Sequence, residues 1–219
     1  MIKTYSRKID GAQHLSTNFQ VLEFACPDGA DEILIDEVLV QYLQQIRDYF
    51  AQPVIIGSGY RTKQYNQLIG GDPDSAHMYG QAADIDVGRD VAAIPARTVA
   101  MYAEAIGITR IGLYIYPDGS SWIHIGSGEG KLFWFDSAPG KRTRPNTFLP
   151  ILRRQYIYWT HKYEVRVAQE ILAAKGYYKD KIDGKFGPNM QKAVRAFQKA
   201  VKIPVDGVIG PITWRKLFQ

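Results

Sequence analysis

Two histidines and one aspartate are the residues of this sequence best suited to bind a metal ion. His77 and Asp84 lie seven residues apart, and His124 follows further along the chain. On one helix, seven residues make two turns, or roughly 10 Å, too far for two ligands that each lie ~2 Å from one zinc ion. A loop that turns at Gly80 into a strand can bring them together. Three protein ligands and one open position are typical of catalytic zinc, whereas a lone histidine is more often an ordinary polar residue.

The elements that must position these residues can be predicted from hydrophobic patterns. Apolar and acidic residues alternate over 83–87, which predicts a strand with Asp84 and Asp86 on one face. A pair of strands joined by a turn is predicted over 111–125, and its second strand carries His124.

The segment between these strands and the first helix is rich in Gly, Asp, Asn and Gln. Residues 60–83 therefore predict a long ordered loop with one helical turn, and such loops are usually functional. The other expected elements are a helix with a stripe from Ile35 to Tyr49, a strand at 54–56, a helix from Pro95 to about 106 and a strand at 131–135. This pattern predicts an α+β domain with a small, largely antiparallel sheet.

The last quarter of the chain contains an internal repeat. Asp183-Gly-Lys-Phe-Gly-Pro188 and Asp206-Gly-Val-Ile-Gly-Pro211 are 23 residues apart, and each precedes a helical pattern. Glycine allows the tight turn, and proline suits the first position of a helix. The expected helices are 165–175, 189–201 and 212–218. The sequence therefore predicts a small all-α domain of three helices.

Composition excludes several classes of protein. The chain has 219 residues, of which 46% are hydrophobic and 22% charged, as in a globular protein. Its single cysteine, Cys26, excludes an internal disulfide framework and a zinc ribbon. Apolar runs are too short to span a bilayer, and the N-terminal residues do not resemble a signal peptide.

Charge divides the chain into two parts. Residues 1–138 carry a net charge of −7 and residues 139–219 carry +12. We expect a first domain at 1–138, a basic linker at 139–163 and the helical domain at 164–219. The basic part favours a polyanion, either nucleic acid or an anionic cell-wall polymer.

The C-terminal pattern resembles the bacterial peptidoglycan-binding domain of the three-helix type. The matching positions are mostly structural glycines and core residues: Gln169, Leu172, Gly176, the two Asp-Gly turns, Ala193, Phe197, Gln198, Thr213, Trp214 and Leu217. This resemblance implies a domain that anchors a cell-wall hydrolase.

The N-terminal pattern resembles the zinc D-Ala-D-Ala carboxypeptidase family of metallopeptidases over about 15–135. The similarity rests on Ser58-Gly-Tyr-Arg61, on Ser75-Ala-His77-Met-Tyr-Gly80-Gln-Ala-Ala-Asp84 and on Trp122-Ile-His124. It implies that His77, Asp84 and His124 bind zinc, that Arg61 stabilises the oxyanion or a substrate carboxylate, and that Ser75 forms a hydrogen bond beside the ligands. His14 and His161 match no motif.

The sequence departs from that family at the general base. Relatives carry an acid three residues before or two residues after the second histidine, and here these positions are Ser121 and Gly126. The nearby acids are Asp86, Asp118 and Glu129, and the sequence does not distinguish a displaced base from a residue that orients a histidine.

The leading hypothesis is a zinc peptidase that cleaves stem peptides or cross-bridges of peptidoglycan and is held on the wall by its C-terminal domain. Ser121 and Gly126 motivate an alternative, a degenerate peptidase fold that serves as a wall-binding or phage-tail module. Nucleic-acid binding lacks any supporting motif. We expect peptidoglycan as the partner, no membrane insertion and a monomer. The absence of a signal peptide fits a phage lysin, a phage particle component or another route to the wall.

Overall fold

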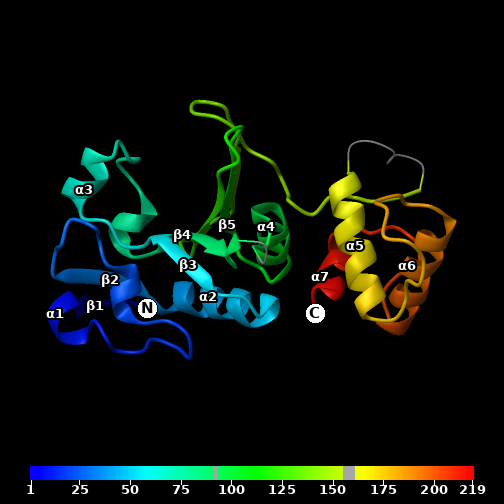
Figure 1. Ribbon diagram of the computed structural model, residues 1–219, viewed down its shortest axis with the longest axis horizontal. Coiled ribbons are helices and arrows are strands. Elements are labelled where there is room, and N and C mark those ends of the chain that lie inside the picture. The colour runs from blue at the N-terminus through cyan, green and yellow to red at the C-terminus, as the bar shows by residue number, and fades with distance from the viewer. Residues whose placement is uncertain (91–92, 155–160) are drawn as a thin grey trace. The chain divides into compact units, whose positions relative to one another are not determined.

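The computed structural model describes residues 1–90, 93–154 and 161–219, which form two compact units, Met1–Asn146 and Thr147–Gln219 (Figure 1). The first unit is α+β and the second is helical, so the expected fold class is confirmed. Among the described residues, no helix combines the length and apolar character needed to cross a membrane.

Most strands of the first unit form one sheet, in the order β3-β4-β6-β5-β7-β8. Their bounds are Val54–Ser58 (β3), Ala82–Val87 (β4), Arg110–Ile115 (β5), Ser121–Gly126 (β6), Leu132–Asp136 (β7) and Arg142–Thr143 (β8). Only β5 and β7 pair in parallel, and the other neighbours are antiparallel. The predicted small, largely antiparallel sheet is therefore correct.

A second sheet was not predicted from the sequence. It pairs β1 (Ile2–Ser6) with β2 (Glu32–Asp36). Ile35 was assigned to the stripe of the following helix, but it lies in β2, and α2 (Glu37–Phe50) begins two residues later. The side chain of Asp36 accepts a hydrogen bond from the amide of Val38 and so caps the first turn of α2.

The two faces of the large sheet differ. One face is apolar and packs against α2 and α4 (Ala96–Ala105). Its buried side chains are Ile85, Ile111, Leu113, Ile123 and Ile125, and Met101 of α4 is fully buried as well. Because side chains alternate along a strand, Asp84 and His124 lie on the opposite face.

The remaining short elements of the first unit lie in its loops. They are α1 (Arg7–Asp10), η1 (Val21–Phe24), α3 (Lys63–Leu68) and η2 (Ala76–Tyr79). The loop expected at 60–83 thus contains two helical segments rather than one, and its last residues begin β4.

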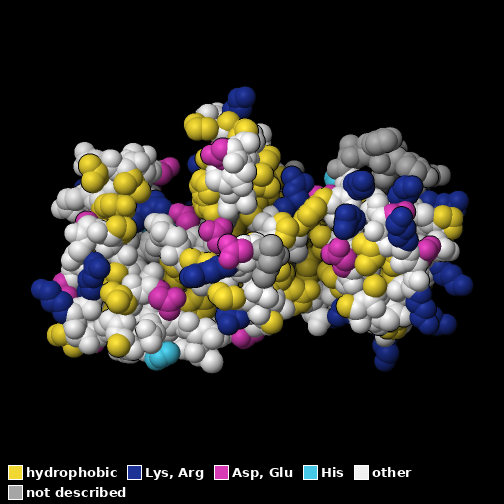
Figure 2. Space-filling view, in the orientation of Figure 1, with side chains coloured by type: hydrophobic (Ala, Val, Ile, Leu, Met, Phe, Trp, Pro, Cys, Tyr) yellow, Lys and Arg dark blue, Asp and Glu magenta, His cyan; other side chains and the backbone are white. Residues whose placement is uncertain are grey.

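The second unit contains the three expected helices, α5 (Lys162–Ala174), α6 (Pro188–Ala200) and α7 (Pro211–Leu217). Trp214 is fully buried in its core. The two repeated turns are held in the same way. Gln169 donates to the carboxylate of Asp183, and Gln198 donates to that of Asp206. The surface of this unit is rich in Lys and Arg (Figure 2).

The stretch expected to link the domains, 139–163, contains ordered segments. Within it, β8 pairs with β7, and Leu152 exchanges two backbone hydrogen bonds with Ile209. The indole of Trp214 also donates to the carbonyl of Pro150 at 2.8 Å. Residues 155–160 lie outside the described residues. The division between the two units, at 146/147, falls inside this stretch.

Candidate metal centre

His77 is held by a short 3-10 helix and by the loop that precedes it. Gly80 ends η2 with a φ of 66°, a left-handed conformation that glycine adopts without strain, and β4 follows. His77 is 2% exposed, and its Nδ1 lies 2.8 Å from the carbonyl oxygen of Gly59. Because a carbonyl can only accept, Nδ1 carries the proton, and the lone pair of Nε2 is free to bind a metal.

Asp84 and His124 are placed by the register of two strands. They are direct partners across β4 and β6. Nδ1 of His124 lies 2.9 Å from Oδ1 of Asp84, and Nε2 of His77 lies 3.2 Å from that nitrogen and 3.3 Å from Oδ2 of Asp84. The structure therefore brings together the three residues that the sequence analysis proposed as ligands.

The chemistry of this donor set fits a cation. The three atoms that converge are Nε2 of His77, Nδ1 of His124 and a carboxylate oxygen of Asp84. Because the proton of His77 is on Nδ1, these three atoms carry at most one proton, that of His124, while both imidazoles are neutral. Burial lowers the pKa of His124, which favours its neutral form. Burial alone would raise the pKa of Asp84, but hydrogen bonds with His124 and His77 outweigh it, and the pKa lies well below its usual range. Two neutral imidazoles and a carboxylate are ligands that zinc accepts.

Arg61 lies directly against this cluster. Its Nη2 donates to Oδ2 of Asp84 at 2.6 Å, and its Nε donates to the hydroxyl of Ser58 at 2.8 Å. The guanidinium thus holds a ligand carboxylate in place, a function that the sequence analysis did not foresee. Its other terminal nitrogen, Nη1, donates to no acceptor in the described part of the chain.

Ser75 immediately precedes η2, two residues before His77. Its backbone amide donates to the carbonyl of Asp72 at 3.0 Å, and its hydroxyl does not cap the 3-10 helix. The side chain is partly exposed.

The two positions where relatives carry an acid differ in their placement. Gly126 shares a face with His124, and a Cβ added there would lie 3.6 Å from Nε2 of His124 and 3.1 Å from the Cβ of Arg110. Ser121 is an odd number of residues from His124, so it points to the other face. An acid at position 126 would therefore reach the histidine, whereas one at position 121 would not.

The nearby acids have different surroundings. Asp86 lies on the same face of β4 as Asp84, and its side chain is exposed. Partial desolvation by the neighbouring residues raises the pKa of its carboxyl group. Asp118 accepts hydrogen bonds from the amide and hydroxyl of Ser120, so it serves the turn of the hairpin. The carbonyl of Glu129 accepts from Arg110.

Three residues beside the cluster were missed by the sequence analysis: Gly112, Tyr114 and Trp134. Gly112 is the partner of His124 on β5, and Trp134 is the partner of Gly112 on β7. The ring centroids of Trp134 and His124 lie 4.9 Å apart. Alternation along 111–116 could have placed Gly112 and Tyr114 on one face, but only the strand order places them beside His124.

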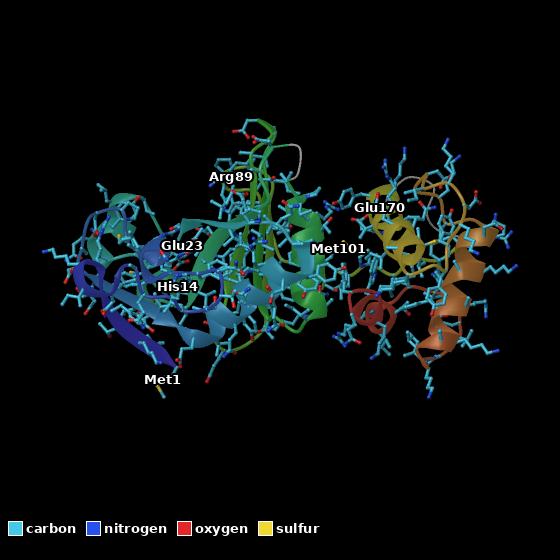
Figure 3. All side chains as sticks on the ribbon, turned by 60° about the horizontal axis from the view of Figure 1, so that its bottom comes forward. Met1, His14, Glu23, Arg89, Met101 and Glu170 are labelled. Carbon is cyan, nitrogen blue, oxygen red and sulfur yellow. The ribbon has the colours of Figure 1, made fainter. Side chains whose placement is uncertain are left out.

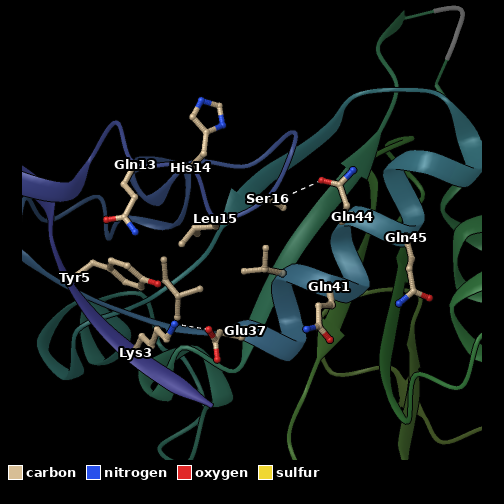
Figure 4. A pocket seen from close by; sticks show the side chains of 12 residues that line it. Lys3, Tyr5, Gln13, His14, Leu15, Ser16, Glu37, Gln41, Gln44 and Gln45 are labelled. Atoms are coloured by element: carbon tan, nitrogen blue, oxygen red, sulfur yellow. Dashed lines mark hydrogen bonds and ion pairs between the residues drawn. The ribbon is translucent and has the colours of Figure 1, made fainter.

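The other two histidines lie outside the cluster. His161 faces Glu164, 3.6 Å away. His14 contacts Gln20 at 3.0 Å and lines a separate cavity of about 480 Å³ (Figures 3 and 4). That cavity is formed by β1, by Ile35 of β2, by the loop at 13–16 and by α2, and no candidate ligand lines it.

Two families match the sequence. Residues 16–126 match the family described as Peptidase M15, and residues 161–217 match a peptidoglycan binding domain. A zinc D-Ala-D-Ala carboxypeptidase of Streptomyces albus G is 34% identical over 88 residues, which are 40% of this chain and 32% of that protein. An uncharacterized protein of Kitasatospora aureofaciens is 40% identical over 48 residues, which are 22% of this chain and 41% of that protein.

A solved structure of a peptidoglycan-binding protein from Clostridioides difficile, in complex with glutamine hydroxamate, is 19% identical. The match covers 80% of this chain and 87% of that one with a TM-score of 0.31, too low to bear on the function of this chain. The chain spans about a third of the length of the carboxypeptidase that it matches. The Peptidase M15 match covers half of the chain and includes all three candidate ligands, so the chain belongs to the peptidase M15 family and carries a peptidoglycan-binding domain at its C-terminal end.

Proposed function

We propose that this protein is a zinc peptidase that hydrolyses peptide bonds in the stem peptides or cross-bridges of peptidoglycan. The observation that carries the proposal is the convergence of His77, Asp84 and His124, whose ligand atoms, one from each residue, lie within 4.8 Å of one another. Two imidazoles and one carboxylate are a donor set found in catalytic zinc sites, where a water or substrate takes the fourth position.

The zinc ion would be held by Nε2 of His77, Nδ1 of His124 and the carboxylate of Asp84. When bound, zinc supplies a Lewis acid that polarises the scissile carbonyl and lowers the pKa of water to ~7.

The protein's own residues orient the ligands and the substrate. The carbonyl of Gly59 fixes the tautomer of His77, and Arg61 holds the carboxylate of Asp84. Nη1 of Arg61 remains for a substrate carbonyl or carboxylate, which suits a planar and permanently charged guanidinium. The hydroxyl of Ser75 is proposed as a hydrogen-bonding group for the substrate beside His77.

The C-terminal unit would hold the peptidase on its polymeric substrate. Residues 147–219 contain 14 Lys and Arg but only 5 Asp and Glu, which favours an anionic wall polymer. Attachment to the wall raises the effective concentration of stem peptides around the metal centre.

The test is to incubate the zinc-loaded protein with purified peptidoglycan sacculi and to identify released fragments by mass spectrometry. New peptide ends are expected from the wild type, and they should be lost in a chelated sample and in His77→Ala. The variant His14→Ala is a matched control, since His14 lies outside the metal centre.

The absence of a side chain at Gly126 favours a second candidate function. Without an acid beside His124, the fold would bind zinc and the wall but cleave no bond. Full zinc occupancy and sedimentation with sacculi, without new peptide ends, would support this wall-binding role and contradict the proposed hydrolysis.

A further inference from the structure

One row of register partners crosses four strands on the face of the sheet opposite α2 and α4. Asp84 on β4 pairs with His124 on β6, His124 with Gly112 on β5, and Gly112 with Trp134 on β7. The side chain of His124 contacts both Asp84 and Trp134, and the remaining position of the row is a glycine.

The glycine makes room for the indole. A Cβ at Gly112 would lie 2.3 Å from Cε2, 2.4 Å from Cζ2 and 2.6 Å from Nε1 of Trp134, closer than real contacts allow. The indole therefore lies across the backbone of Gly112, and this position brings its ring against the imidazole of His124. Trp134 is only 8% exposed, so its orientation is fixed by packing.

The indole in turn fixes a phenol. Nε1 of Trp134 donates to the hydroxyl oxygen of Tyr114 at 2.9 Å. On its other side the ring of Tyr114 stacks on Trp122, with centroids 4.6 Å apart and an interplanar angle of 9°. Tyr114 is thus held by a hydrogen bond and a stacking contact, both beside the metal centre.

The hydroxyl group of Tyr114 can donate a hydrogen bond. Its oxygen accepts from the indole, and its own O–H donates to no acceptor among residues 1–90, 93–154 and 161–219. Burial raises the pKa of Tyr114, and the negative charge of Asp84 raises it further, so the phenol stays protonated at neutral pH. The side chain as a whole is only partly buried.

We propose that Tyr114 is a catalytic hydrogen-bond donor that stabilises the negative charge on the scissile carbonyl oxygen of the substrate. This inference rests on the proposed peptidase function. The two sides of the metal centre differ. Arg61 flanks the ligands beside Asp84. On the side of His124, Gly126 has no side chain and Ser121 points to the other face of the sheet. On that side the structure holds the hydroxyl of Tyr114 in place through its hydrogen bond from Trp134. Loss of one such donor lowers kcat by about 10²–10³-fold in other hydrolases.

The test compares Tyr114→Phe with Tyr116→Phe as a matched control. Tyr116 follows two residues later on the same face and belongs to the same aromatic cluster, further from His124. Both variants should bind zinc as the wild type does, measured by elemental analysis. We expect kcat on the bond identified with sacculi to fall about 10²-fold in Tyr114→Phe with KM nearly unchanged, and Tyr116→Phe to match the wild type.

A binding measurement separates this role from a merely structural one. A phosphinate analogue of the cleaved bond mimics the charged intermediate. Its Kd, measured by calorimetry, should weaken in Tyr114→Phe by about the same factor as kcat, while the Kd of the product peptide stays constant. Equal kcat and equal phosphinate affinity in Tyr114→Phe and the wild type would overturn the inference and leave the peptidase intact. A wild type that cleaves no bond would overturn both.

Discussion

Nδ1 of His124 lies 2.9 Å from Oδ1 of Asp84 because the two residues face each other across β4 and β6. The separation is set by the hydrogen bonds between the strands rather than by the loop that carries His77. Two of the three candidate ligands therefore have a geometry that the sheet itself maintains.

Removing a ligand should abolish tight zinc binding. We expect Asp84→Ala to weaken zinc affinity by more than the roughly 10–100-fold that loss of an outer hydrogen-bond partner costs. Competition with a chromophoric chelator measures the Kd, and Asp118→Ala, in the turn of the hairpin, serves as the control. Unchanged affinity in Asp84→Ala would place the metal elsewhere.

Arg61 should affect the metal as well as the reaction. Arg61→Met removes the donor to Asp84 and is expected to weaken zinc affinity by about 10–100-fold. Arg61→Lys keeps the charge but cannot contact Ser58 and Asp84 at the same time. The zinc affinity of this variant should therefore lie between those of the wild type and Arg61→Met. If Arg61→Met lowers only the rate of hydrolysis and leaves the zinc Kd unchanged, the arginine acts on the substrate alone.

An acid restored beside His124 should raise activity. Gly126→Asp would place a carboxylate near Nε2 of His124 after a small shift of Arg110, whose Cβ lies 3.1 Å from the added Cβ. General-base catalysis contributes about 10²–10⁴-fold, so we expect kcat to rise by at least the lower figure. Gly126→Ala controls for the added bulk. No gain over Gly126→Ala would show that this position does not provide a base.

Filling the space over Gly112 should damage the site without touching a ligand. In Gly112→Ala the new methyl group would collide with Trp134, and overpacking of this kind costs about 1–3 kcal/mol of stability. Thermal unfolding measures that loss, and kcat should fall because Tyr114 loses its fixed partner. Gly57→Ala is the control, since its nearest neighbour would lie 3.7 Å away.

The stability of the C-terminal unit should depend on pH through Asp183. Burial opposes ionisation, but hydrogen bonds from Gln169 and the amide of Lys185 lower the pKa of Asp183. A lowered pKa stabilises the fold above the unfolded value of about 3.9, and this contribution disappears as pH falls through the folded value. Asp183→Ala should therefore cost about 1–2 kcal/mol at pH 7, and less below pH 4.

Urea unfolding of the full chain at pH 7 and pH 3, followed by circular dichroism, measures this difference. Glu170→Gln is the control, because Glu170 is exposed and lies 4.0 Å from Arg166. An equal loss of stability at both pH values in Asp183→Ala would mean that the charge of Asp183 contributes nothing.

Local patterns predicted the elements that carry the ligands, but not their neighbours. Alternation along 83–87 correctly placed Asp84 on a strand, and the turn at 117–121 correctly placed His124 on the next. Trp134 could not be placed beside His124, because β5 pairs with β7 in parallel, and no local pattern encodes that pairing. The sequence analysis also missed β2, because the position of Ile35 fits the apolar spacing of the following helix as well as that of a strand. Only the pairing with β1 distinguishes the two.

The division of the ligands between sheet and loop has a consequence for how such enzymes diversify. The loop that carries His77 is anchored near its two ends. At one end, the carbonyl of Gly59 and the amide of Arg61 form hydrogen bonds with His77, and at the other the carbonyl of Gly80 accepts from the amide of Asp36 in β2. Residues 62–76, which include the exposed Leu68 and Ile69, form no hydrogen bond or ion pair with His77, Asp84 or His124 in the part of the chain that the structure describes. Insertions or exchanges there can alter which peptide is accepted while the ion keeps its coordination, so a new specificity can evolve without passing through an inactive ancestor.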